Sequence, residues 1–333
     1  MPLSSYLYDA EGRDHQVELS AETLSSLGDQ RLLWIDVVGR DPAELKQVAR
    51  TLELDPASLR TLLSAGSTRL ENFGKYIQLS VETAPAIVEA DGNVGRNGGH
   101  TVQPHVRLDI LIDKAWLVTV HEGEVGFIEA FRSQDRAETM IGALTTHDFA
   151  ASLLDMHLEA YFKEIARVEG LVDKLDEQAL IRPSSKTLLG RMVTLRRRVS
   201  RLRTLLSAQR AVFYGLSRPD LQIVAEAGAS PHFTILASRY ERAIDEVEHT
   251  RDLVVGSFEL FASRTAQQTN ELVKVLTFLT AVLGFCAAIA GVFGMNFEAN
   301  VFATGNAGFY TTIAALILIT LVLAITARWR RWL

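Results

Sequence analysis

Residues 275–293 read VLTFLTAVLGFCAAIAGVF and residues 309–327 read FYTTIAALILITLVLAITA, and neither stretch contains a charged side chain. Each is nineteen residues long, close to the roughly twenty apolar residues that a helix needs to cross the hydrocarbon core of a bilayer. Neither has a polar face of any width, as a buried helix of a soluble protein usually has. We therefore expect two membrane-spanning helices.

Basic residues indicate the orientation of these spans. The connection 294–308 contains no Lys or Arg, whereas Lys274 precedes the first span and residues 328–333 read RWRRWL after the second. Since Lys and Arg are retained on the cytoplasmic side of short flanking segments, we expect a multi-pass protein of the cytoplasmic membrane with both termini inside. The first sixteen residues show no basic segment followed by an apolar one, so we expect no cleaved signal.

Composition argues against several other functions. The net charge of −6 is mild and its groups are interspersed, which favours neither nucleic acid nor a strongly charged substrate. The single cysteine, Cys286, lies inside the first span and leaves no soluble thiol for redox or metal chemistry. The histidines are dispersed, and no catalytic triad or phosphate-binding motif is present. We expect neither an enzyme nor a bound cofactor.

Residues 1–145 alternate short β-rich runs with amphipathic helical ones and predict an α/β domain. Candidate strands are 31–38, 76–83, 106–112 and 115–120; candidate helices are 42–52 and 56–63, opened by Asp41 and Asp55 as N-caps, each followed by proline. The Gly/Asn-rich stretch 91–99 indicates a loop. Sequence alone does not separate Asp36, Asp41, Glu82 and Asp91 from ordinary surface acids.

Residues 146–230 predict a helical hairpin. Apolar residues recur at alternating spacings of three and four, the seam of a coiled coil. They are Leu154, Leu158, Tyr161, Ile165, Val168, Val172, Leu175, then Met192, Leu195, Val199, Leu202, Leu206 and Phe213. The break falls at residues 182–185, with Pro183 in the first turn of the second helix. Arginines at 191, 196, 197, 198, 201, 203 and 210 flank this seam, so we expect ion pairs there rather than nucleic acid.

Residues 231–274 predict a stalk helix that continues into the first span, about 90 Å long if unbroken over residues 233–293. Small and polar residues fall on one face of its membrane part: Asn270, Thr277, Gly284 and Gly291 are seven apart, with Thr280, Ala281, Ala287 and Ala288 between them. This stripe has two uses, close helix packing in lipid or the lining of a lumen around a symmetry axis. The second span lacks such a stripe and suits an outer position facing lipid. One pair of spans cannot enclose a pore, so a pore requires an oligomer.

Three short segments resemble the CorA family of divalent cation transporters. They are Asn270-Glu271-Leu272-Val273-Lys274-Val275-Leu276-Thr277 entering the first span, Gly294-Met295-Asn296-Phe297-Glu298 leaving it, and the terminal Trp332-Leu333. Their order behind an α/β domain and a helical stalk extends the resemblance over essentially the whole chain.

The resemblance implies a funnel-shaped homopentamer that takes up Mg²⁺, and also Co²⁺ or Ni²⁺, under the control of intracellular metal. Asn296 would present a ring of carboxamide oxygens at the outer mouth, where Gly294 permits a tight turn, Met295 packs and Glu298 attracts cations. Such neutral oxygens suit a hydrated ion. Pore-lining positions would be Asn270, Val273, Leu276, Thr277, Thr280, Gly284, Ala287 and Gly291, with Leu276 and Val273 as an apolar constriction.

Some features differ from magnesium-selective relatives. Residues 299–305 read ANVFATG where a Met-Pro-Glu-Leu segment often follows, and the first span has Gly284-Phe285 in place of a proline. Gly66-Ser67-Thr68-Arg69 and the segment RYERAIDEV at 239–247 are more similar to the ZntB zinc-transport branch. A proton-coupled zinc transporter and a membrane-anchored sensor or scaffold therefore remain alternatives.

Five stalk acids predict a regulatory metal site. Glu241, Asp245, Glu248, Asp252 and Glu259 lie on one helical face, where carboxylates of neighbouring subunits could share an ion. The other interpretation is a solvated face paired with Arg239, Arg242, Arg251 and the hairpin arginines, and it is the one that charge runs usually favour.

Overall fold

The computed structural model describes residues 3–9, 14–28, 31–64, 66–85, 87–88, 101–102, 105–134, 140–181, 186–295 and 305–329. The chain divides into two compact units, one of Met1–Lys174 with Leu189–Gly256 and one of Leu175–Leu188 with Ser257–Leu333. These boundaries cut long helices, so the units do not coincide with the segments expected from sequence.

A seven-stranded sheet in the order β2-β1-β3-β9-β8-β5-β4 forms the centre of the first unit. Its strands are β1 (Leu3–Asp9), β2 (His15–Gln16), β3 (Arg31–Val38), β4 (Arg69–Asn72), β5 (Ile77–Glu82), β8 (Arg107–Ile112) and β9 (Trp116–His121). Neighbouring strands are antiparallel except β3 and β9, which are parallel. The four strands expected from sequence are β3, β5, β8 and β9, each correct to within one residue. A separate ladder pairs β6 (Ile87–Val88) with β7 (Thr101–Val102).

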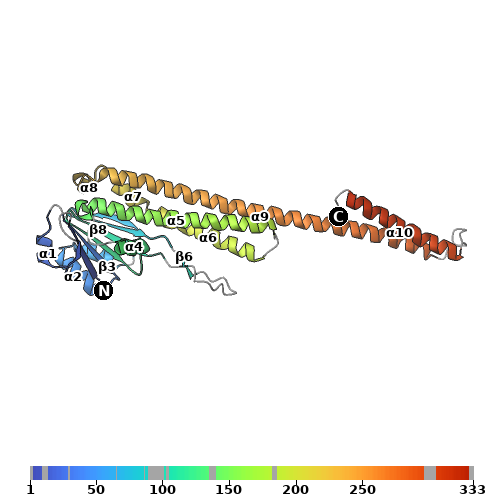
Figure 1. Cartoon of the computed structure of the whole chain (residues 1–333), viewed down its shortest axis with the longest axis horizontal. Coiled ribbons are helices and arrows are strands. Elements are labelled where there is room, and N and C mark those ends of the chain that lie inside the picture. The colour runs from blue at the N-terminus through green and yellow to red at the C-terminus, as the bar shows by residue number, and fades with distance from the viewer. Residues whose placement is uncertain are drawn as a thin grey trace. The chain divides into compact units, whose positions relative to one another are not determined.

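Helices cover both faces of this sheet (Figure 1). On one face, α2 (Pro42–Thr51) and α3 (Pro56–Leu63) pack over buried Leu33, Ile35 and Val37. Their predicted N-caps are confirmed, because the Asp41 and Asp55 carboxylates accept bonds from Ala43 N and Ala57 N at 2.9 and 2.7 Å.

Trp34 anchors the other face of the sheet. Its ring lies 5.6 and 5.7 Å from those of Phe131 in α4 (Gly126–Gln134) and Phe149 in α5 (Thr146–Ile181). The small elements α1 (Ala21–Ser25) and η1, a 3₁₀ turn at Met140–Ala143, complete the domain.

The predicted coiled-coil hairpin consists of α5 and α6 (Lys186–Ala208). All thirteen seam residues are buried, and Glu164 of α5 pairs with Arg198 of α6. The predicted break at 182–185 lies outside the described residues. One feature was not expected: α6 ends at Ala208 and is followed by the short helices α7 (Arg210–Leu216) and α8 (Gln222–Glu226).

The predicted stalk is a single helix, α9 (Ser230–Phe293), of 64 residues. In the first unit α9 lies alongside α5 and runs in the same direction (Figure 1). His232 Nδ1 lies 2.6 Å from the Asp148 carboxylate, and the Thr250 hydroxyl donates to Glu169 at 2.7 Å. These contacts fix the register of the stalk against the hairpin.

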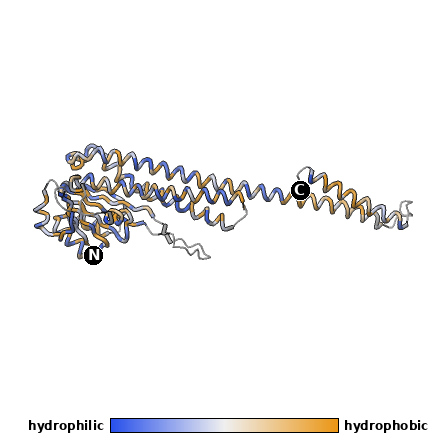
Figure 2. The backbone as a smooth tube through the Cα atoms, in the orientation of Figure 1, coloured by the Kyte–Doolittle hydropathy of each residue, from blue (hydrophilic) through white to orange (hydrophobic). Residues whose placement is uncertain are grey.

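In the second unit the C-terminal part of α9 is followed by α10 (Gly305–Trp329), which begins four residues before the predicted span. Figure 2 shows that both helices are apolar over most of this length. Each holds an 18-residue window of mean hydropathy 2.3, of which 6% and 0% is buried in the chain. A core helix of a soluble protein would be mostly buried, so the low burial of these two apolar windows favours membrane spans.

Candidate ion pathway

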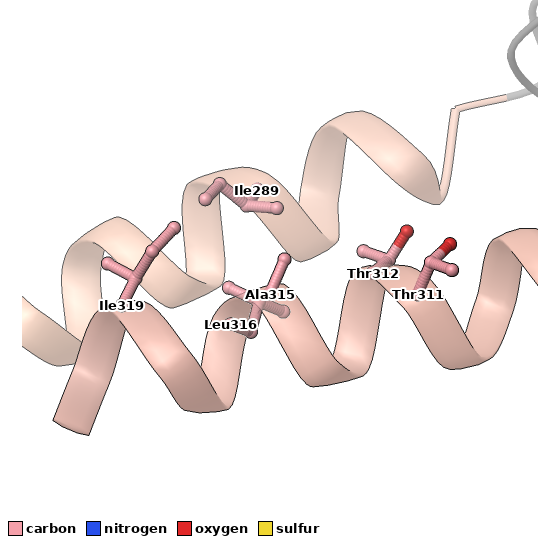
Figure 3. Close-up of a pocket in the computed structure, with 6 residues that line it drawn as sticks. All are labelled: Ile289, Thr311, Thr312, Ala315, Leu316 and Ile319. Atoms are coloured by element: carbon pink, nitrogen blue, oxygen red, sulfur yellow. The ribbon is translucent and has the colours of Figure 1, made fainter. Parts of the chain in front are cut away.

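One face of α9 packs against α10 in the second unit. Phe278, Val282, Cys286 and Ile289 are the partly buried residues along this part of α9, and their spacings of four, four and three place them on one side of the helix. The Cys286 Sγ lies 3.7 Å from the Thr320 Oγ1. Ile289 also lines a groove with five residues of α10: Thr311, Thr312, Ala315, Leu316 and Ile319 (Figure 3).

The predicted pore-lining stripe lies on the opposite face of α9. Gly284 and Gly291 follow Val282 and Ile289 by two residues, which is about 200° around a helix. A Cβ added to either glycine would meet no atom within 4 Å. All eight predicted positions are exposed in the single chain, including Val273 and Leu276 at 52% and 63%. The small residues therefore do not serve to pack α9 against α10, and the stripe is exposed in the single chain.

The C-terminal end of α9 closes by a tight turn. Gly294 N donates to Ala290 O at 2.9 Å and Met295 N donates to Val292 O at 3.3 Å. Gly294 does not adopt a positive φ, but a Cβ there would lie 3.3 Å from Ala290 O, so close backbone approach rather than a left-handed conformation favours glycine. Met295 is 51% exposed in the single chain. Asn296 and Glu298 lie outside the described residues, and their roles stay predictions.

The threonines of α10 are satisfied within their own helix. Thr311, Thr312, Thr320 and Thr326 each donate to a carbonyl one turn earlier, at 3.0, 2.8, 2.8 and 2.6 Å. A hydroxyl bonded in this way can face lipid at little cost. This agrees with an outer position for α10.

The five stalk acids lie on one side of α9, across the helix from buried Tyr240, Ala243, Val247 and Val254. Glu248 pairs with Arg203 and Arg251, and Glu241 accepts the Tyr214 hydroxyl. Asp245 and Glu259 have no ion pair within the described residues. In that part of the chain no three metal-ligating side chains come together, so one chain alone does not form the predicted regulatory site.

The arginines give a mixed result. Arg198 and Arg203 form the expected ion pairs, with Glu164 and Glu248. Arg239, however, pairs with Asp155 and Glu159 of α5 at 3.0 and 2.5 Å rather than with a stalk acid. The expectation that Arg239 pairs with the stalk acids was therefore wrong, because the register of α5 against α9 places Asp155 and Glu159 next to Arg239.

Two fully buried aspartates were not recognised from sequence. Asp36 accepts the Thr119 hydroxyl and lies beside His121 and Arg132. It is therefore a core residue rather than a candidate surface acid. Burial lowers the pKa of His121, which favours its neutral form.

Asp109 accepts hydrogen bonds from Arg40 at 2.5 Å, from Arg107 at 2.6 Å, and from Ser80. The two arginines also bond the Thr61, Leu62 and Ser64 carbonyls at the end of α3. A polar residue between apolar ones in a strand was the available signal, but two partners of Asp109, Arg40 and Ser80, are distant in sequence. The cluster fixes α3 to the sheet and is structural.

Of the other acids singled out from sequence, Asp41 is the N-cap already described and Asp91 lies outside the described residues. Burial raises the pKa of the Glu82 carboxyl despite the nearby His105 and Arg107. A half-buried carboxyl with a raised pKa is a poorer cation ligand than an ionised surface acid. Among the described residues, neither Asp36, Asp41 nor Glu82 therefore stands out as a metal ligand.

The fold and site together define a class of protein: an α/β domain is followed by a long helix whose C-terminal part is apolar, and a second apolar helix follows it. Residues 29–330 match the family model described as CorA-like Mg²⁺ transporter protein. This chain belongs to that family, one of membrane transporters for divalent metal ions.

The cobalt/magnesium transport protein CorA of Thermotoga maritima is 29% identical over 182 residues, which span 55% of this chain and 51% of that protein. The chain thus matches about half the length of this relative. The CorA protein of Methanocaldococcus jannaschii is 21% identical over 92% of this chain and 93% of its own.

Two solved structures show the same fold. The complete structure of the CorA magnesium transporter from Methanocaldococcus jannaschii has a TM-score of 0.73 and 19% identity, and the match covers 100% of this chain and 99% of that one. The ZntB cytoplasmic domain from Vibrio parahaemolyticus has a TM-score of 0.59 and 9% identity over 80% of this chain and 100% of its own. At these identities the likeness concerns the fold alone.

Proposed function

We propose that this protein carries divalent metal cations across the cytoplasmic membrane through a pore built from several copies of α9. The observation that carries the proposal is the stripe of small and hydroxyl-bearing residues on α9, which is exposed on the face opposite α10. An anchor whose spans only pack against one another could use the small residues, but it does not need the polar residues Asn270 and Asn296 at the two ends of the stripe. A ring of α9 helices with α10 outside would place it around the axis, where backbone and hydroxyl groups can line a narrow lumen.

The assembly we propose is a homopentamer, as the resemblance implies, with both termini in the cytosol. Two helices of one chain cannot enclose an ion, so the pathway is incomplete without further copies. The family and the basic tail after α10 support this orientation. Asn296 then forms the outer mouth, and Leu276 with Val273 forms the inner constriction.

The cargo we propose is Mg²⁺, with Co²⁺ and Ni²⁺ as further substrates. Mg²⁺ loses its water slowly and is held best through its hydration shell, which a ring of neutral carboxamides can bind without trapping. Entry is passive, driven by a potential worth about 2.3 kcal/mol per charge per 100 mV. Intracellular metal closes the pore by binding between stalk acids of neighbouring chains.

A proton-coupled zinc transporter of the ZntB type is the second candidate. Two observations favour it: the sequence after Glu298 lacks the additional acid of magnesium-selective relatives, and the cytosolic part also matches the ZntB fold. Both candidates share the pore and differ in cargo and in driving force.

The test is metal flux into proteoliposomes holding the full-length protein. Mg²⁺, Co²⁺, Ni²⁺ and Zn²⁺ are supplied one at a time, with and without a proton gradient and a membrane potential. Asn296→Ala is compared with Asn306→Ala, a matched change at an exposed position of α10. Potential-driven Mg²⁺ entry lost only in Asn296→Ala supports the proposal. Zinc entry that follows the proton gradient supports the second candidate, and no flux of any metal contradicts both.

A further inference from the structure

The helix α6–α7 is interrupted at one residue, Gln209, although that residue keeps a right-handed helical backbone with φ −86° and ψ −2°. Gln209 N donates to Leu206 O at 3.0 Å and Val212 N donates to Gln209 O at 2.9 Å. Both bonds reach three residues back, whereas a continuous α-helix would use Leu205 O and Ala208 O. A short tightening of this kind inside a helix often marks a hinge.

Three side chains hold this break. The Gln209 side-chain amide donates to Leu205 O at 3.0 Å and so replaces its own backbone N–H. The Thr68 hydroxyl donates to Ala208 O at 2.5 Å. The Tyr240 hydroxyl donates to Leu206 O at 2.8 Å. Thr68 belongs to the connection between α3 and β4, while Tyr240 belongs to the stalk α9, so the α/β domain and the stalk both bond to the same turn.

Gln209 also fastens the break to the sheet. It is fully buried, and its amide nitrogen lies 3.0 Å from Glu82 O of β5 and 3.1 Å from the Tyr161 hydroxyl, so its two hydrogens are shared among these two oxygens and Leu205 O. The Gln209 side-chain oxygen lies 2.7 Å from His157 Nε2. On the far side, Phe213 of α7 stacks on Tyr240 with ring centroids 4.7 Å apart. The short helix α7 thus lies in direct contact with the stalk.

We propose that the interruption at Gln209 is a joint with two states, broken and continuous, that couples the α/β domain to the stalk helix. In the continuous state Gln209 N–H and Val212 N–H bond Leu205 O and Ala208 O. Leu205 O and Ala208 O then accept from backbone N–H groups in place of the Gln209 side-chain amide and the Thr68 hydroxyl. The position of Leu206 O, and with it the hydrogen bond from the Tyr240 hydroxyl, also changes. Thr68 and Tyr240 both favour the broken state, so each acts on the other through the joint.

The coupling is reciprocal by thermodynamic necessity, and hydrogen exchange on the full-length protein in nanodiscs can measure it. Thr68→Val and Tyr240→Phe each remove one donor while keeping the shape. We expect Thr68→Val to lower protection at residues 236–247 about three- to tenfold, the effect of one hydrogen bond, and Tyr240→Phe to do the same at residues 66–70. In the double variant the two effects should not add.

Matched controls remove the same groups elsewhere. Thr204→Val deletes a hydroxyl that donates to Ser200 O within α6, and Tyr76→Phe deletes one that accepts from Asp55 N at the start of α3. Both controls should change exchange only near their own positions. If Thr68→Val and Tyr240→Phe also act only locally, or if their effects add, the joint does not exist.

A second measurement rests on the proposed function. The metal concentration that half-inhibits flux should shift in the same direction in Thr68→Val and Tyr240→Phe and stay unchanged in both controls. A wild-type protein without flux would end the transport proposal, yet the exchange measurement would still decide the coupling. Unchanged inhibition together with long-range exchange effects would overturn the regulatory role of the joint.

Discussion

Replacement of Asp109 by asparagine is the sharpest test of how the α/β domain is held together. The carboxylate is fully buried and is shared by Arg40 and Arg107, whose side chains are only 12% and 11% exposed. Asparagine keeps the shape and removes the charge. Arg40 retains Glu122 at 3.1 Å. Among the described residues Arg107 keeps no ion pair within 4 Å, and its remaining hydrogen bonds are to the Thr61 and Ser64 carbonyls and the Ser80 hydroxyl.

Breaking a buried ion pair from one side costs about 3–5 kcal/mol, because a buried charge is left without its partner. For a unit of this size each kcal/mol lowers the melting temperature by roughly 2–4 °C. We therefore expect Asp109→Asn to melt about 6–20 °C below wild type. Tryptophan fluorescence of the full-length protein can follow this transition, since Trp34 and Trp116 lie buried in the sheet.

Two further variants make the experiment decisive. Asp220→Asn removes a carboxylate paired with Arg218 on the surface, where both side chains are more than 60% exposed, and should not shift the melting temperature measurably. Arg107→Met combined with Asp109→Asn removes the uncompensated charge and should recover part of the loss. A shift in Asp109→Asn no larger than that in Asp220→Asn, or no recovery in the double variant, would refute this reasoning.

Three other predictions concern pH, the stripe and metal. Burial lowers the pKa of His157 from 6.5 to about 4, so the neutral side chain contributes its full stability above pH 6.5 and loses about 3 kcal/mol of it as the pH falls to 4. Chemical denaturation between pH 7 and 4 should therefore show a shallower dependence of the free energy of unfolding on pH for His157→Gln than for wild type. An equal dependence would contradict this. Gly284→Leu should abolish flux without altering the melting of the sheet, because a Cβ there meets no atom of its own chain, while Ala314→Leu on the exposed side of α10 should transport normally. Millimolar Mg²⁺ should protect the stalk from protease relative to a chelator, and Asp245→Asn should weaken that protection; equal cleavage in both conditions would exclude an acidic metal site on the stalk.

The long helices and the central strands could be predicted from local pattern. The seam from Leu154 to Phe213 and the strand 31–38 could be recognised from their own residues, since a hydrophobic period near 3.5 or a short, largely apolar run is a local property of the sequence. The strand β1 and the edge strand β4 were missed because neither is buried throughout and neither shows a clear alternation of apolar and polar residues. The ends of α6 and the start of α7 were missed because the break depends on donors from Thr68 and Tyr240.

The candidate site was predictable in composition but not in arrangement. Spacing placed Gly284, Gly291 and Thr277 on one face, yet only the packing of α9 on α10 showed that this face is not used within the chain. Similarly, spacing grouped the stalk acids, whereas the pairing of Arg239 with Asp155 and Glu159 followed from the register of α5 against α9.

The sequence by itself determined what each segment needs: two apolar runs that belong in a bilayer, a seam that must be covered, and helix caps that satisfy local donors. These are one-dimensional properties, because hydropathy, period and capping act over a few residues. Only the tertiary structure decided which partners meet those needs. Asp36 and Asp109 are buried beside Arg132 and Arg40, which are far from them in sequence, and the break at Gln209 bonds to Glu82 of the sheet and Tyr240 of the stalk. Such contacts depend on how chain segments pack in three dimensions, and no local pattern encodes them.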